Sequence, residues 1–180
     1  MEFIEKDLEE IIYEACKCEE GRNHLFERGI SISGTLLRQL DLGSYGRADL
    51  VSMFFDGPGN RYMNVNVIEL KRGIVDSNAL SQACRYLTGL KRYFSSKDKF
   101  SDITIDYKIT LIGNDVNRQD DFVFIYNECS EFCEIYKYKY EIDGIHFEYI
   151  KPCWKIDSER FGAIEENLDI DIDKGIINKI

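Results

Sequence analysis

Two carboxylates and one lysine stand at a spacing that suits a divalent-cation site. Asp49 falls early in one expected strand, and Glu69 and Lys71 lie two residues apart around the end of the next strand. Side chains at positions i and i+2 of a strand point to the same face. If the two strands pair as a hairpin, Asp49 lies across from the end of the second strand, so both carboxylates meet the ammonium group. Because like charges repel at that distance, a cation is the usual resolution.

The chemistry expected of such a site is hydrolysis of a phosphodiester bond. Ligation by oxygens of Asp49, Glu69 and the carbonyl group of Leu70, with positions open to water, suits Mg²⁺ or Mn²⁺. The metal lowers the pKa of a bound water, while the ammonium group of Lys71 orients the nucleophile or stabilises the oxyanion. The plain alternative is a solvated hairpin face on which Lys71 is a cross-strand ion-pair partner.

The elements that must position these residues follow from apolar periodicity, caps and turns. Asp76 is a good N-cap for the second long helix. The segment 119–129 fits either a helix or a strand, and the helix is favoured. In chain order we expect a helix over 3–16, strands over 36–42, 47–55 and 62–70, a helix from Asp76 to Phe94, a strand over 107–113, the segment 119–129, and strands over 132–141 and 145–150 turned at Asp143 and Gly144.

This order predicts an α/β (α+β) fold in one domain. A mixed central sheet flanked by helices, in the order αβββαβ, is expected to occupy about residues 3–115. The remaining residues, 116–180, form a C-terminal elaboration that begins with a β-hairpin. We find no internal repeat and no linker-like stretch in residues 1–180, so a second domain is not expected.

Three motifs in this order resemble the PD-(D/E)XK nuclease superfamily. They are residues 46–50 (Gly-Arg-Ala-Asp-Leu), 67–73 (Val-Ile-Glu-Leu-Lys-Arg-Gly) and 82–86 (Gln-Ala-Cys-Arg-Tyr). The Gln-x-x-x-Tyr element is similar to the RecB-like branch. The opening helix with its Glu5 and Glu9, and the segment 37–39 (Leu-Arg-Gln), resemble most closely the NucS-type endonuclease domain.

The resemblance implies a restriction-endonuclease-like core and a Mg²⁺-dependent (or Mn²⁺-dependent) deoxyribonuclease. By position, Asp49 and Glu69 match the metal-binding carboxylates, and Lys71 matches the catalytic lysine. Either Glu5 or Glu9 matches the acidic residue of the first helix; Glu5 is preferred, although the spacing does not decide. The remaining implied residues lie near the site or the nucleic acid: the helix pair Gln82 and Tyr86, and the contact residues Gln39, Arg47, Arg72 and Arg85.

Charge is distributed unevenly along the chain of 180 residues. The formal net charge is −10, yet residues 47–99 hold nine basic and five acidic side chains. The basic middle third favours DNA as a partner, because a duplex is usually met by a basic face. The overall acidity keeps a second hypothesis open, a catalytically inactive module on the same fold that binds a protein partner, nucleic acid or a second copy of itself.

The location expected from the sequence is the cytoplasm. No apolar run approaches the ~18 residues of a membrane span, and the first residues do not follow the pattern of a signal peptide. In a reducing compartment the six cysteines would be free thiols. Some RecB-like nucleases hold an iron–sulfur cluster through four cysteines. The spacing of Cys129, Cys133 and Cys153 does not fit its compact trio, so buried thiols are favoured.

Two further patterns carry weaker signals. The segment 169–175 (Asp-Ile-Asp-Ile-Asp-Lys-Gly) is similar to the start of a calcium loop but has no glycine at the sixth position, so an alternating strand or an acidic tail is favoured. His24 and His146 have no partner at ligand spacing and are interpreted as structural.

Overall fold

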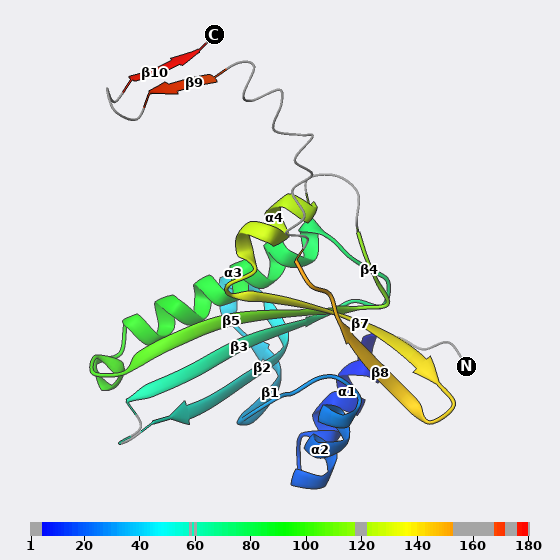
Figure 1. The fold of residues 1–180 in the computed structure, drawn as a ribbon. Helices are drawn as coiled ribbons and strands as arrows, with labels where there is room; N and C mark the ends of the chain where they lie inside the picture. The colour runs from blue at the N-terminus through cyan, green and yellow to red at the C-terminus, as the bar shows by residue number, and fades with distance from the viewer. Residues whose placement is uncertain are drawn as a thin grey trace.

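A computed structural model gives the fold and describes residues 5–57, 59, 61–117, 122–152, 168–171 and 176–179. Figure 1 shows the arrangement of its elements. In chain order they are α1 (Glu5–Ala15), α2 (Glu19–Glu27), β1 (Thr35–Asp41), the 3₁₀ turn η1 (Gly43–Tyr45), β2 (Arg47–Asp56), β3 (Tyr62–Leu70), β4 (Ile74–Val75), α3 (Ser77–Ser95), the 3₁₀ turn η3 (Asp98–Phe100), β5 (Thr104–Gly113), β6 (Asp115–Val116), α4 (Phe122–Cys129), β7 (Cys133–Glu141), β8 (Gly144–Tyr149), β9 (Leu168–Asp171) and β10 (Ile176–Lys179).

Six strands form one mixed sheet in the order β1-β2-β3-β5-β7-β8. Strands β1, β2 and β3 are antiparallel neighbours, β5 runs parallel to both β3 and β7, and β8 returns antiparallel to β7. The parallel step from β3 to β5 is made through α3, as a crossover connection requires. The predicted mixed α/β fold with a helix-flanked sheet is therefore confirmed.

Helices cover both faces of this sheet, with α3 and α4 on one face and α1 and α2 on the other (Figure 1). Strand β3 contributes side chains to both hydrophobic cores, because its side chains alternate between the two faces of the sheet. Val65 and Val67 pack in the core with α3, whereas Ile68 and Leu70 pack in the core with α1. The strand that ends at Glu69 and Leu70 is thus fixed from both sides.

The elements that matter most for the site were predicted closely. The third expected strand matches β3 over Tyr62–Leu70, and the antiparallel register that pairs Leu50 with Ile68 confirms the expected hairpin. Helix α3 begins after its N-cap Asp76, whose side chain accepts hydrogen bonds from the amides of Asn78 and Ala79. The ambiguous segment forms α4, so the favoured helix is confirmed over its described residues.

From the sequence we expected no element between the first helix and the first strand, and this was wrong. Residues 19–27 form α2, in which Leu25 is the buried side chain. Long-range contacts hold this helix, since the guanidinium of Arg22 donates hydrogen bonds to the carbonyl oxygens of Ile32 and Gly34, each at 2.7 Å. A helix with so little apolar periodicity gives a weak sequence signal.

The described cysteines are free thiols that lie on both sides of the sheet. Cys16 is buried in the core beside α1, and Cys133 is buried in the core beside α3. Cys84 and Cys129 are partly buried and Cys18 is exposed, so the expectation of buried thiols holds for Cys16 and Cys133 and is wrong for Cys18; Cys153 lies outside the described residues. The start of the calcium-like segment, at Asp169 and Asp171, belongs to β9 and pairs antiparallel with β10.

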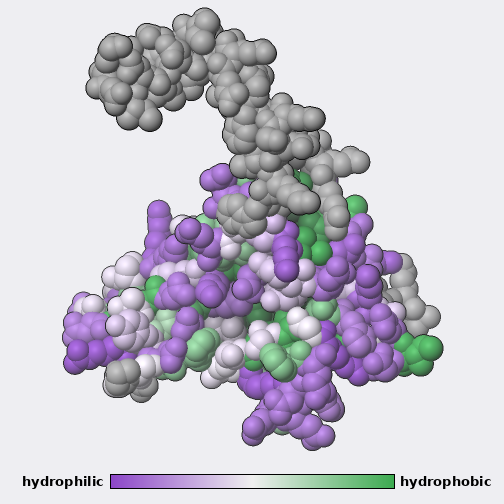
Figure 2. All heavy atoms as spheres, in the orientation of Figure 1, coloured by the Kyte–Doolittle hydropathy of each residue, from purple (hydrophilic) through white to green (hydrophobic). Residues whose placement is uncertain are grey.

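The visible surface is mostly hydrophilic, with hydrophobic residues in small separate areas (Figure 2). Among the described residues, no helix is both long and apolar enough to cross a lipid bilayer.

Removal of the α3 N-cap should destabilise the helix that carries Gln82 and Tyr86. We expect Asp76→Ala to lower the free energy of unfolding by about 1 kcal/mol, because the first-turn amides lose their acceptor. Asp76→Asn is the matched control, since asparagine caps about as well. Urea unfolding measures both, and equal losses for the two variants would contradict the capping role.

Candidate active site

The two predicted metal carboxylates lie side by side where β2 begins and β3 ends. One oxygen of Asp49, Oδ2, accepts a hydrogen bond of 3.0 Å from the backbone amide of Leu70. Glu69 is 1% exposed, and its Oε1 accepts a hydrogen bond of 2.7 Å from the ammonium group of Lys71. The other oxygen, Oε2, is buried and has no hydrogen-bond partner within the described part of the chain.

Burial and mutual repulsion make these carboxylates costly to ionise. Burial and, after it, the nearby charge of Asp49 together raise the pKa of Glu69 to about 7, and Lys71 only partly opposes the shift. Burial also raises the pKa of Asp49, against the hydrogen bond from Leu70. Burial lowers the pKa of Lys71, but its bond to Glu69 and the neighbouring acidic charges outweigh this and leave that pKa above its ordinary value. Lys71 is therefore an ammonium ion at neutral pH.

This donor set fits a hard divalent cation. An unpartnered carboxylate oxygen in a buried position costs free energy that metal ligation recovers. Glu69 Oε2 and the carboxylate of Asp49 are the oxygens available to hold such an ion. Leu70 is buried and its backbone amide donates to Asp49, so the Glu69–Leu70 peptide lies at the site. Ligation by the carbonyl group of Leu70 stays a prediction.

Helix α3 connects to Lys71 through a chain of hydrogen bonds. The ammonium group of Lys71 lies 3.4 Å from Gln82 Oε1, and the amide of Gln82 donates to the hydroxyl of Tyr86 at 2.7 Å. Gln82 and Tyr86 are one helical turn apart, which brings their side chains together. The structure thus brings together the predicted set of Glu69, Lys71, Gln82 and Tyr86.

Helix α1 brings both candidate glutamates to the site from the opposite side of the sheet. Glu5 accepts a hydrogen bond of 2.9 Å from the amide of Arg72, and its charge contributes to the raised pKa of Glu69. Glu9 is buried, and its charge contributes to the raised pKa of Asp49. Both glutamates contribute to the raised pKa of Asp49, and Glu5 also contributes to that of Glu69, so the preference for Glu5 over Glu9 stays a prediction.

Gln39 faces these carboxylates. Its amide nitrogen donates to Glu9, whose other oxygen accepts from the guanidinium of Arg38, and it lies 3.5 Å from Asp49 Oδ1. Arg38 also forms an ion pair of 2.5 Å with Glu10. The expected contact between Gln39 and nucleic acid stays a prediction.

A basic surface borders the site along α3 and η1. Arg85 stacks over the ring of Tyr86, with its guanidinium carbon 5.5 Å from the ring centroid. Arg92 donates a hydrogen bond of 2.8 Å to the hydroxyl of Tyr45, and Tyr45 in turn packs on Gly89, where a Cβ would lie 2.8 Å from its ring. We call Arg85, Arg92 and the exposed Arg47 the basic rim.

The η1 turn is followed by Gly46, which packs against the ring of Tyr86. Gly46 has φ +98 and lies so close to Tyr86 that an added Cβ would be 3.0 Å from the ring. A side chain at this position would force a disfavoured backbone conformation and would press against the ring of Tyr86, so glycine is required here. Arg72, the remaining predicted contact residue, is held through its backbone, since its carbonyl oxygen accepts a hydrogen bond from Tyr138.

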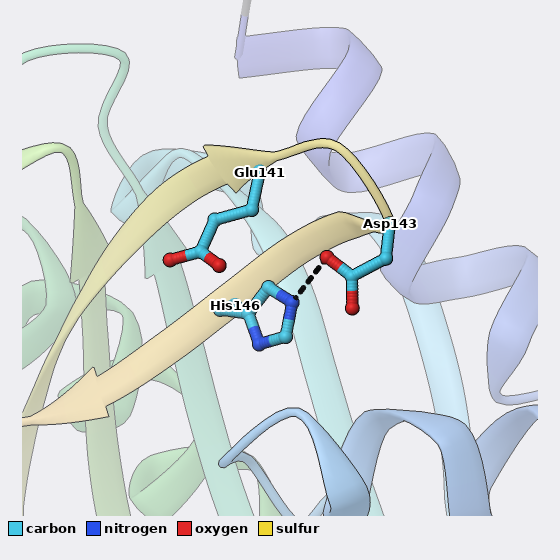
Figure 3. Close-up of side chains that lie close together, drawn as sticks. All are labelled: Glu141, Asp143 and His146. Atoms are coloured by element: carbon cyan, nitrogen blue, oxygen red, sulfur yellow. Dashed lines mark hydrogen bonds and ion pairs between the residues drawn. The ribbon is translucent and has the colours of Figure 1, made fainter.

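A second group of possible metal ligands lies on the β7–β8 hairpin, where Figure 3 shows Glu141, Asp143 and His146 close together. Their ligand atoms are within 4.8 Å of one another. A bond of 2.9 Å joins His146 Nε2 to Asp143 Oδ1, and this bond lowers the pKa of Asp143. The expectation that His146 has no partner at ligand spacing was therefore wrong. Both carboxylates are exposed, and the bond between Asp143 and His146 accounts for their proximity at the hairpin turn. We therefore regard this group as a weak and nonspecific candidate for metal binding.

The sequence did not reveal the pairing of Arg38 with Glu9 and Glu10, or the contact of Tyr45 with Arg92. Both contacts join segments that are far apart in the chain, so residue spacing carries no signal for them. The glycines at 43 and 46 were the one available indication of a specific turn before β2.

Comparisons with known proteins return no match to a family model, to a curated protein or to a solved structure.

The stability of the metal-free protein should depend on the ionisation of Glu69. Its pKa of about 7 exceeds the ordinary 4.5, so between these values the folded state binds more protons than the unfolded state. The free energy of unfolding should therefore fall as pH rises through this window, by up to about 3 kcal/mol. Urea unfolding in EDTA at about pH 5 and about pH 8 measures this, and Glu69→Gln should remove the fall. Parallel pH profiles for the two proteins would contradict the assignment.

Proposed function

We propose that this protein is a metal-dependent nuclease that hydrolyses phosphodiester bonds of DNA. The observation that carries the proposal is the buried Oε2 of Glu69 beside the carboxylate of Asp49: it has no hydrogen-bond partner among the described residues, while Lys71 donates to the other oxygen of Glu69. A bound Mg²⁺ or Mn²⁺ would supply Lewis acidity at the phosphate and activate water for attack.

Lys71 is the residue best placed to act on the scissile phosphate. Its ammonium group is charged at neutral pH and is held between Glu69 and Gln82, while its side chain remains 24% exposed. A fixed positive charge of this kind stabilises the negative charge that develops on phosphate oxygens during hydrolysis. Gln82 and Tyr86 fix the direction of the ammonium group, so they act as positioning residues in this proposal.

The basic rim supports a polyanionic substrate. Arg85 and Arg92 belong to α3, the helix that also carries Gln82 and Tyr86. Their guanidinium groups lie over the rings of Tyr86 and Tyr45. Guanidinium groups in fixed positions suit phosphate oxygens. The choice of DNA rests on the resemblance to PD-(D/E)XK nucleases in the motifs around Asp49, Glu69 and Gln82.

Cleavage of labelled DNA tests the proposal. With Mg²⁺ or Mn²⁺ we expect wild-type protein to cut single-stranded, duplex or forked DNA, and Lys71→Ala to lower the rate by about 10²–10³-fold through loss of the fixed charge. Lys108→Ala, at an exposed lysine of β5, is the matched control and should cut like the wild type.

The outcomes separate catalysis from binding. Equal cutting by wild type and Lys71→Ala, after removal of contaminants, would refute the assignment. Binding of DNA or protein without cutting by any of the three proteins would favour the noncatalytic module, to which the net charge of −10 points.

A further inference from the structure

Gln39 has a backbone conformation that its side chain does not favour. Its φ is +51, and it is the one non-glycine residue with a positive φ in the described part of the chain. Left-handed backbone is disfavoured for L-residues with a long side chain. Such strain persists only where the surrounding structure imposes it, and it gathers at functional sites.

The strain coincides with a break in the β1–β2 ladder. Arg38 pairs with Leu50 and Leu40 pairs with Ala48, whereas no ladder pairing joins Gln39 to Asp49 between them. The irregular backbone turns the amide of Gln39 toward two acidic side chains, Glu9 from α1 and Asp49 from β2. The feature therefore lies where helix α1 and the two strands meet at the candidate site.

The two bonds of this amide differ in strength. Glu9 is a firm anchor, because it is buried and its carboxylate accepts from both Arg38 and Gln39. Asp49 Oδ1 is 3.5 Å from the same amide nitrogen, at the outer limit of a hydrogen bond. The Oδ2 atom of Asp49 is held more closely by the amide of Leu70. Oδ1 is thus oriented by Gln39 through a bond weak enough to give way to a cation.

We propose that Gln39 is a positioning residue for the cation site: its strained backbone holds the side-chain amide between Glu9 and Asp49 and keeps Oδ1 of Asp49 turned toward the metal position. This inference rests on the proposed function, because it assigns a role at the same site. The amide also separates two carboxylates that would otherwise repel each other directly.

Two variants of Gln39 distinguish the effect of losing its side-chain amide from the effect of relieving its backbone strain. Gln39→Gly removes the amide and relieves the backbone, whereas Gln39→Ala removes the amide and keeps the disfavoured φ. Gly59→Ala is the control for strain alone, since Gly59 has φ +72 with open space around it and lies in the β2–β3 turn, at the far end of these strands. Mn²⁺ titration by calorimetry at about pH 8, where Glu69 is ionised, and thermal melting in EDTA give the two readouts.

We expect both Gln39 variants to bind Mn²⁺ at least about tenfold more weakly, as is typical when a group that orients a ligand is lost. Gln39→Ala should melt about 2–4 °C lower, whereas Gln39→Gly should melt no lower than the wild type. Gly59→Ala should melt lower and bind Mn²⁺ normally.

Other results overturn the inference in distinguishable ways. If the wild-type protein binds Mn²⁺ and Gln39→Gly binds it equally tightly, the positioning role of Gln39 is refuted and the proposed function is not. A melting temperature of Gln39→Gly as low as that of Gln39→Ala would refute the stored strain. Failure of the wild-type protein itself to bind Mn²⁺ would overturn the proposed function together with this inference.

Discussion

The burial of the Glu69 carboxylate beside Asp49 is the constraint on which the rest of the site depends. An ionised carboxylate away from water costs several kcal/mol unless other groups compensate it. Lys71 compensates one oxygen of Glu69, and the second oxygen has no partner among the described residues. Under the proposed function, a buried cation site accounts for why the sheet carries this cost in stability.

The fold supplies the rigidity that this arrangement needs. Strand β3 is clamped between two hydrophobic cores, so the backbone that carries Glu69 and Lys71 has little freedom to relax. Helix α3 reaches the site from one face through Gln82, and helix α1 reaches it from the other through Glu5 and Glu9. Sites built on packed helices and strands hold their geometry better than sites on loops.

The sequence predicted the parts of this arrangement that depend on local patterns. Alternation identified β3, the cap at Asp76 located the start of α3, and the hairpin placed Asp49 beside Glu69. Helix α2 was missed because contacts of Arg22 with distant carbonyl groups replace apolar periodicity. The positive φ of Gln39 also escaped prediction, because it arises from the meeting of α1, β1 and β2 and leaves no trace in residue spacing.

Crystals soaked in Mn²⁺ and measured by anomalous diffraction would test the central claim most directly. The account predicts a peak between Glu69 Oε2 and the carboxylate of Asp49, at about the 2.1 Å typical of oxygen ligands to such small divalent ions. A peak confined to the exposed group of Glu141, Asp143 and His146, with none beside Glu69, would contradict it.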